Sequence, residues 1–162
     1  MAVTAAIGLG ANLGDAAATV RAAIAALADL PDTELLAASR LYRTPAWGET
    51  AQPDFINAAA LLRTGLEARA LLQALLAIER RHGRERSAAT RWGARTLDLD
   101  LLLYGDAVIA EAGLHVPHPH LHERAFALVP LLEIAPEIAI PGVGPAREAL
   151  ARLPAEGIEA LG

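Results

Sequence analysis

The most regularly patterned stretch of this 162-residue chain is Thr96-Leu97-Asp98-Leu99-Asp100-Leu101-Leu102-Leu103-Tyr104. Successive side chains of a β-strand point to opposite faces of its sheet, so residues two apart share a face. We therefore predict a strand over Thr96–Tyr104 that directs Asp98 and Asp100 to one side. The opposite side faces an apolar core through Leu97, Leu99, Leu101 and Leu103.

The two aspartates of this strand are candidates for a metal site. Their attachment points lie roughly 6–7 Å apart on one face. Two carboxylates this close repel each other and are costly to bury without a partner. Divalent cations relieve that cost, and two Mg²⁺ ions bridged by carboxylates and phosphate oxygens favour in-line displacement at phosphorus. The alternative from the residues alone is a salt-bridge cluster between Asp98, Asp100 and neighbouring Arg side chains.

A cluster of cations precedes the aspartates, although the chain carries a formal net charge of −5. Within 16 residues it contains Arg80, Arg81, Arg84, Arg86, Arg91 and Arg95. Guanidinium groups in such a cluster suit a phosphate-rich small ligand. The favourable interaction between cations and the C-terminal end of a helix would explain only Arg80 and Arg81. The net negative charge argues against a general nucleic-acid binder.

Hydrophobic periodicity and turn residues predict the remaining elements. We predict strands over 3–9, 34–44, 55–64 and 107–109, helices over 15–30, 67–82 and 124–134, extended chain over 116–122, and a weakly patterned tail from 136. The order β-α-β-β-α-β is that of a split-βαβ, ferredoxin-like fold of the α+β class. We therefore expect an antiparallel sheet flanked by helices, with long active-site loops over 45–53 and 83–93. Residues 1–162 are expected to form a single domain.

Composition narrows the class of protein further. Cysteine is absent, which excludes disulfides, thiolate catalysis and Cys-ligated zinc. The longest stretch without Asp, Glu, Lys or Arg is Met1–Gly14, which is too short to span a bilayer and lacks the cations of a secretory signal. We expect a cytoplasmic protein, monomeric, without a nucleic-acid or membrane partner.

Two further motifs are a glycine-rich run near the start of the sequence and a group of histidines between 115 and 122. The glycine-rich run Gly8–Gly14 has Leu13 where a dinucleotide fingerprint needs its third Gly, so we interpret it as a tight turn before a capped helix. Four His between His115 and His122 could bind zinc, but no further His or Cys cluster completes such a site. We therefore expect one or two of these His to contact phosphate, together with Arg124.

Three other side chains are weaker candidates. Phe55 and Asn57 share a strand face that could stack on and hydrogen-bond a flat heterocycle, although a core Phe is the simpler interpretation. Glu79, near the end of the second helix, could bind a metal or an Arg, or could be an ordinary solvated residue.

Taken together, four segments of the chain resemble the 6-hydroxymethyl-7,8-dihydropterin pyrophosphokinase family of folate biosynthesis. The segments are Ile7–Gly14, Leu41–Thr64, Ile78–Gly105 and Val116–Pro136. Residues 91–100 match the family signature closely, and Pro117-His118 with Glu123-Arg124-Ala125-Phe126 supports the match independently. The residues alone lead only as far as phosphoryl-type transfer, so the pterin enters through this resemblance.

The resemblance implies transfer of the β,γ-pyrophosphoryl unit of ATP to the pterin hydroxymethyl oxygen, with release of AMP. Asp98 and Asp100 would hold two Mg²⁺ ions that bridge the triphosphate, and attack would fall on the β-phosphorus. Arg84 and Arg95 match the mobile arginines that clamp the triphosphate and offset developing charge, so they join the aspartates as catalytic residues.

The resemblance also assigns the binding residues. The ATP-binding set is Glu79, Arg84, Arg86, Trp92, Arg95, His118 and Arg124. The pterin-binding set is Thr44, Pro45, Ala46, Trp47, Phe55, Asn57, Asp98 and Phe126. Within the second set, Phe55 and Phe126 would sandwich the pterin while Asn57 reads its polar edge. Trp47 and Trp92 belong to the two loops that would close over the ligands.

Several positions depart from the family pattern and concern adenosine recognition. They are Leu76, Gly113, His115 and Pro119, together with an Arg86–Arg91 loop that is one residue longer. Two rival functions stay open at this point. One is a metal-dependent hydrolase or glycosyltransferase that uses the Asp-x-Asp pair, and the other is a non-catalytic pterin- or nucleotide-binding module.

Overall fold

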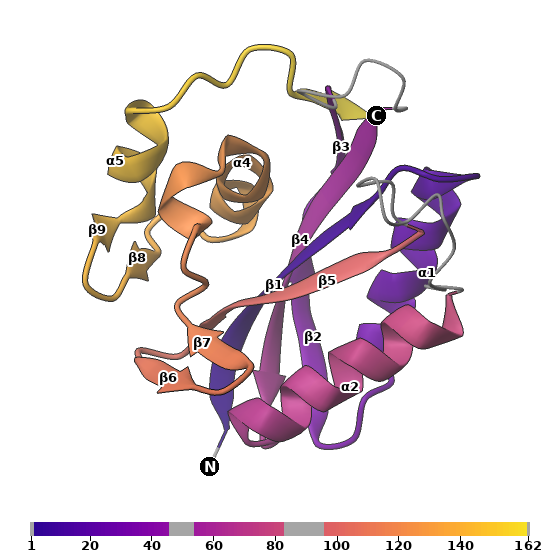
Figure 1. The fold of residues 1–162 in the computed structure, drawn as a ribbon, viewed down its shortest axis with the longest axis vertical. Coiled ribbons are helices and arrows are strands. Elements are labelled where there is room, and N and C mark those ends of the chain that lie inside the picture. Colours follow the sequence, from indigo (N-terminus) through magenta and orange to yellow (C-terminus); the bar gives the residue numbers. More distant parts are fainter. Residues whose placement is uncertain (1, 46–53, 83–95, 162) are drawn as a thin grey trace.

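The structure, a computed structural model, describes residues 2–45, 54–82 and 96–161. Its centre is a six-stranded sheet in the order β10-β3-β4-β1-β5, with β2 also paired to β4 (Figure 1). These strands are β1 (Val3–Ala11), β2 (Thr33–Ala38), β3 (Leu41–Thr44), β4 (Phe55–Thr64), β5 (Asp98–Tyr104) and β10 (Glu159–Leu161). Neighbouring strands of the sheet are antiparallel. The predicted ferredoxin-like, α+β arrangement is confirmed.

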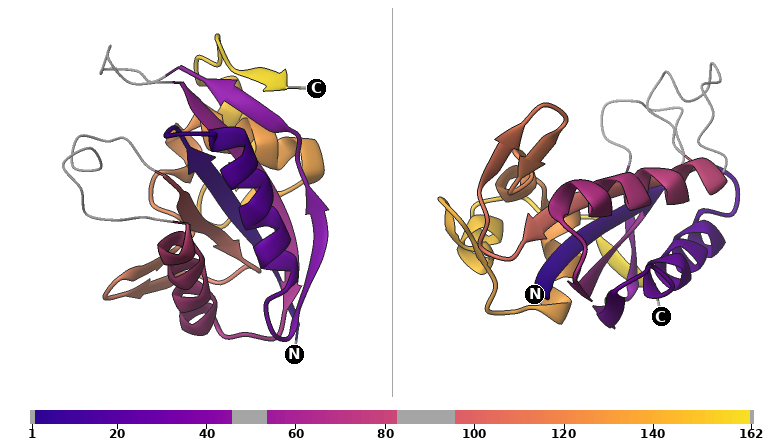
Figure 2. Two further views of the ribbon diagram at one scale, coloured as in Figure 1. Left: turned by 90° about the vertical axis from the view of Figure 1, so that its right-hand side faces the viewer. Right: turned by 90° about the horizontal axis from the view of Figure 1, so that it is seen from below.

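Helices cover both faces of this sheet (Figures 1 and 2). On one face α1 (Ala16–Ala28) and α2 (Ala68–Arg81) bury a core against β1, β4 and β5. Asp15 caps α1 by accepting a hydrogen bond from the Ala18 N–H at 3.1 Å, which satisfies one of the donors left open at a helix start. In α2 the predicted apolar spacing buries Leu71, Leu75 and Ile78.

The opposite face carries the second core. There α4 (Ala125–Ile134) and α5 (Ala146–Ala151) pack on the sheet with the short helix η1 (Leu121–Glu123). Two small hairpins complete the described elements. β8 (Ala139–Ile140) and β9 (Gly144–Pro145) form the one beside α5, whereas β6 (Ile109–Glu111) and β7 (Leu114–Val116) form one that packs with the first core. In the part of the chain that is described, no helix is long and apolar enough to cross a membrane.

The strand with the two aspartates departs from strict alternation near its end. Leu101 and Leu103 pair with the neighbouring residues Ile7 and Ala6, so Leu102 is an extra residue in the ladder. The irregularity turns Leu103 toward the α4 face, where it joins the second core with Leu102. The prediction that Leu103 shares a face with the other odd-numbered leucines was therefore wrong.

Three other boundaries differ from those predicted. The strand predicted over 34–44 is divided into β2 and β3 at residues 39 and 40, where the buried Ser39 hydroxyl donates to the carbonyl of Arg40 and accepts the N–H of Ala59. The short strand predicted over 107–109 begins at Ile109 and pairs with β7, of which only Val116 lies in the stretch predicted as extended chain. The tail from 136 forms α5 and then β10, which pairs with β3.

Candidate active site

A cavity of about 380 Å³ opens on the α4 face of the sheet, and its volume is within the range of small-molecule sites. Four strands of the sheet supply its floor, while the segment from His118 to the first turn of α4 supplies its opposite wall. Its lining residues are Gly8, Leu9, Gly10, Thr44, Pro45, Phe55, Asn57, Ala58, Asp98, Asp100, Leu102, His118, Leu121, Arg124, Phe126 and Ala127.

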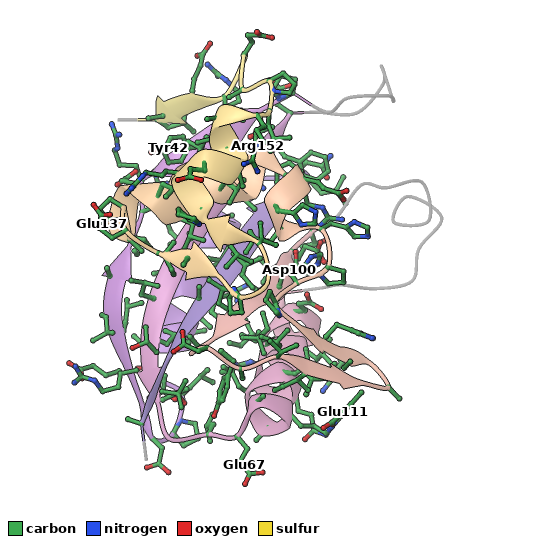
Figure 3. All side chains as sticks on the ribbon, turned by 90° about the vertical axis from the view of Figure 1, so that its left-hand side faces the viewer. Tyr42, Glu67, Asp100, Glu111, Glu137 and Arg152 are labelled. Carbon is green, nitrogen blue, oxygen red and sulfur yellow. The ribbon has the colours of Figure 1, made fainter. Side chains whose placement is uncertain are left out.

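The floor is built around two glycines of β1. Antiparallel pairing sets Gly10 between Asp98 of β5 and Asn57 of β4, and it sets Gly8 beside Asp100. A Cβ at Gly10 would lie 2.9 Å from Asn57 Nδ2, which is closer than real Cβ contacts. Glycine therefore lets the amide and the carboxylates share one surface across three strands. Figure 3 labels Asp100 among the side chains of this region.

Two polar atoms on this surface are buried without a partner among the residues that the structure describes. Within that part of the chain, the hydroxyl oxygen of Thr44 and the amide oxygen Oδ1 of Asn57 make no hydrogen bond, although the two residues are only 2% and 7% exposed. Leaving a buried polar group unsatisfied is costly, and such groups are rare in native proteins. Both residues line the cavity, so these atoms mark where a polar ligand edge would be recognised.

Aromatic rings stand on both sides of the cavity. Phe55 comes from the start of β4 and pairs with Thr44, whereas Phe126 lies in the first turn of α4. The guanidinium carbon of Arg124 lies 5.7 Å from the centre of the Phe126 ring, within the range of a cation–π contact. A flat heterocycle bound between these two rings would therefore lie close to the positive charge of Arg124.

His118 lines the cavity as a neutral hydrogen-bond donor. Its Nδ1 accepts the His120 N–H at 3.1 Å, so the neutral ring carries its proton on Nε2. Burial is the main reason that the pKa of His118 is lowered, and the positive charge of Arg124 lowers it further. Asp98 acts in the opposite direction on this pKa.

The aspartates meet the requirements of a metal shared with a substrate. Among the residues described, no group of three or more His, Cys, Asp or Glu side chains is placed to hold an ion by itself, and this includes the His of 115–122. Mg²⁺ is commonly held by one or two carboxylates, with substrate phosphates and water completing the octahedron. Asp98 and Asp100, both half-buried on the cavity floor, fit that pattern.

Glu79 is a buried residue of α2. It is 2% exposed, and its Oε2 accepts the backbone N–H of Leu99 at 2.7 Å. Leu99 is the residue between the two aspartates, so the carboxylate supports β5 directly behind the acidic pair. The interpretation of Glu79 as a solvated residue was wrong, and the residue is absent from the cavity lining.

The structure brings together most of the residues that the sequence assigned to a site. The predicted site residues that line the cavity are Thr44, Pro45, Phe55, Asn57, Asp98, Asp100, His118, Arg124 and Phe126. Those outside the described residues are Ala46, Trp47, Arg84, Arg86, Trp92 and Arg95. Sequence reasoning missed Gly8 and Gly10, although two glycines spaced by two within a strand indicate a place of close approach.

The positions that depart from the family pattern lie apart from the cavity lining. Leu76 is half-buried on α2, and Pro119 is exposed ahead of η1. Gly113 has a φ of +75° in the turn between β6 and β7, and His115 is exposed on β7. The Arg86–Arg91 loop is outside the described residues.

Comparison with known proteins agrees with this geometry. Residues 6–136 match the family described as 7,8-dihydro-6-hydroxymethylpterin-pyrophosphokinase. A Methylorubrum extorquens protein named 2-amino-4-hydroxy-6-hydroxymethyldihydropteridine pyrophosphokinase is 46% identical over 153 residues, covering 94% of this chain and 95% of its own length. A Pseudomonas aeruginosa protein of the same name is 44% identical over 155 residues, with coverage of 96% and 94%.

Solved structures support the fold independently. The wild-type Plasmodium falciparum HPPK-DHPS structure superimposes with a TM-score of 0.72 at 14% identity, covering 94% of this chain. This chain corresponds to 41% of that longer protein. A second HPPK-DHPS structure, described as a complex with substrates, gives a TM-score of 0.68 at 12% identity, with coverage of 94% and 43%. The extent of the family match and the identity to full-length relatives show that the chain belongs to the 7,8-dihydro-6-hydroxymethylpterin-pyrophosphokinase family.

Proposed function

We propose that this protein transfers the pyrophosphoryl group of ATP to the hydroxymethyl oxygen of 6-hydroxymethyl-7,8-dihydropterin and releases AMP, as a step of folate biosynthesis. Membership of the family makes the protein a pyrophosphokinase. The observation that carries the proposal is one cavity whose lining combines two aromatic rings, a pair of carboxylates, and two buried oxygens that have no partner among the described residues.

The pterin end of the proposed site is the part near β3 and β4. Phe55 and Phe126 would stack on the two faces of the bicyclic ring. Oδ1 of Asn57 would accept a ring or amino N–H, and the Thr44 hydroxyl would bond another polar atom of the same edge. Both oxygens would thereby gain the partner that they lack, which favours a ligand with donors along one edge.

The phosphate end of the proposed site contains the charged groups. Asp98 and Asp100 would hold two Mg²⁺ ions, which supply charge neutralisation and alignment of the triphosphate. His118 would donate from Nε2 to a phosphate oxygen, and Arg124 would contact the same group from the helix start. Arg84 and Arg95, with Arg86 and Trp92, are proposed to bind ATP, the first two stabilising the charge of the transition state. Glu79 is buried and outside the cavity lining, so we propose that it acts on the ATP site through β5.

In the reaction, the hydroxymethyl oxygen attacks the β-phosphorus. The new O–P bond forms as the bond from the β-phosphorus to the bridging oxygen of the α-phosphate breaks, and AMP leaves with that electron pair. The hydroxyl proton passes to water, so the products are AMP, the pterin pyrophosphate and a proton. The protein contributes by holding the two substrates in line, since orientation supplies much of the rate enhancement in such transfers.

We further propose that the protein acts as a monomer in the cytoplasm, where ATP is available. Product analysis separates the proposal from its rivals. AMP that forms only when the pterin is present supports the proposal, whereas ADP, orthophosphate or free sugar supports a hydrolase or glycosyltransferase. Binding of both ligands without turnover supports a binding module.

A further inference from the structure

Residues 154–161 pack against the part of the chain that leads into the cavity wall, although they lie outside the residues matched to the family. The match covers residues 6–136, whereas β10 comprises Glu159–Leu161. β10 pairs antiparallel with β3, setting Glu159 opposite Arg43 and Leu161 opposite Leu41 (Figure 1). β3 leads directly into Thr44 and Pro45, which line the cavity.

Gly157 makes the contact that connects this segment to the cavity. Its φ is +85°, a backbone conformation that side chains other than glycine rarely adopt. A Cβ at this position would lie 3.0 Å from Cγ and 3.4 Å from Cδ of Pro45, so the proline ring would have to shift by a few tenths of an ångström. Gly157 thus lies directly behind the proline of the wall.

A second contact holds the same segment in register. Nη2 of Arg43 lies 3.2 Å from Oε2 of Glu159, and both side chains are exposed. An exposed pair of this kind contributes little stability. The pair nevertheless joins β3, just before Thr44, to the first residue of β10, just after Gly157. It therefore fixes Gly157 and Thr44 relative to each other.

We propose that the segment 154–161 positions the Thr44–Pro45 wall against the pterin, with Gly157 as a positioning residue. This inference rests on the proposed function, because the wall that it supports carries the unpartnered Thr44 hydroxyl. A shift of Pro45 displaces Thr44 relative to Phe55, its partner on β4. The aspartates lie on β5, at the far side of the cavity floor, so the effect falls on the pterin and spares ATP.

The experiment compares Gly157→Ala with Gly142→Ala in the full chain. Gly142 has a φ of +81° and no atom within 4 Å of an added Cβ, so it shares the backbone strain without the contact. We expect Gly157→Ala to raise the KM for the pterin roughly fivefold or more, since small misplacements of binding groups are costly. Its KM for ATP and its kcat should stay near those of wild type, and Gly142→Ala should leave all three unchanged.

A double variant tests whether Pro45 transmits the effect. Pro45→Ala removes the ring carbons that the new methyl group would meet, so adding Gly157→Ala to it should raise the pterin KM no further. Should Gly157→Ala alone fail to fold, the double variant should fold, and failure of both would overturn the proposal. Equal pterin KM values for Gly157→Ala and Gly142→Ala would also overturn it. A wild-type protein that binds no pterin in calorimetry would instead contradict the proposed function.

Discussion

The carboxylate of Glu79 accepts the backbone N–H of Leu99 at 2.7 Å, at the residue that separates Asp98 from Asp100. Among the described strands β5 lies at the edge of the sheet, so the N–H groups on its outer side have no described strand to pair with. A buried helix side chain therefore supplies an acceptor to the strand that carries the acidic pair, and it joins that strand to α2.

Glu79→Leu should destabilise the protein, whereas Glu79→Gln should retain most of the stability because its amide oxygen still accepts the bond. An unpaired buried N–H costs about 1–3 kcal/mol. Denaturant unfolding measures the difference. Glu67→Leu, which removes an exposed carboxylate from the start of the same helix, is the control and should change little. Equal stability of Glu79→Leu and wild type would contradict the support role.

Thr44→Val should stabilise the ligand-free protein and weaken pterin binding. The hydroxyl of Thr44 is buried without a partner among the described residues, so replacing it with a methyl group removes a cost of about 1 kcal/mol or more. The pterin would then lose a hydrogen bond. Calorimetry for the pterin and denaturant unfolding measure the two effects.

Thr64→Val is the matched control for this experiment. Its hydroxyl lies 2.8 Å from the hydroxyl of Thr33 and accepts the Leu66 N–H at 3.1 Å. Loss of those bonds should destabilise the protein by about 1–3 kcal/mol while leaving pterin affinity unchanged. If Thr44→Val were destabilised as strongly as Thr64→Val, the Thr44 oxygen would have a partner in solution.

Asp98→Ala and Asp100→Ala should each lower turnover by roughly two orders of magnitude or more, because each removes a ligand that aligns the transferring group. The folded state should persist, since a like-charge pair has been relieved. Mg²⁺-dependent binding of ATP, followed by calorimetry, should weaken in both variants. Asp106→Ala removes an exposed carboxylate just beyond the strand and should behave as wild type. Turnover within about threefold of wild type for either cavity variant would refute the metal site.

His118 should make the ligand-free protein less stable in mild acid. Because burial lowers its folded-state pKa, the unfolded chain takes up the proton first as the pH falls. Stability is therefore lost as the pH drops below the unfolded value of about 6.5. His118→Asn should show a smaller loss of stability between about pH 7.5 and pH 5 than wild type.

A direct titration by NMR checks the cause of this shift. The pKa of His118 should lie below that of an exposed His, and Arg124→Gln should raise it because Arg124 is one of the groups that lower it. A pKa of His118 at or above the ordinary value would show that burial does not dominate its environment.

Local patterns predicted much of the fold and of the cavity floor. Alternation along 96–104 places Asp98 and Asp100 on one face, and antiparallel pairing then brings that face beside Asn57. The extra residue at Leu102 escaped prediction because a run of three leucines hides a break in alternation. Leu103 was assigned to the wrong face for this reason.

Other features depend on contacts between distant segments. The burial of Glu79 follows from how α2 packs beside β5, which no spacing within the helix reveals. The pairing of β10 with β3 joins residues more than a hundred positions apart, and three residues carry too little pattern to predict a strand. The pterin itself entered through the resemblance to a family, because the residues indicate a phosphate site more clearly than a ring.

The most direct test follows the phosphorus atoms of ATP in a reaction with Mg²⁺ and 6-hydroxymethyl-7,8-dihydropterin. ATP labelled at the α-phosphate should give labelled AMP, whereas label at the β-phosphate should move entirely to the pterin product. Retention of the β-label in a nucleotide, or its release as inorganic phosphate whether or not the pterin is present, would contradict pyrophosphoryl transfer in this cavity.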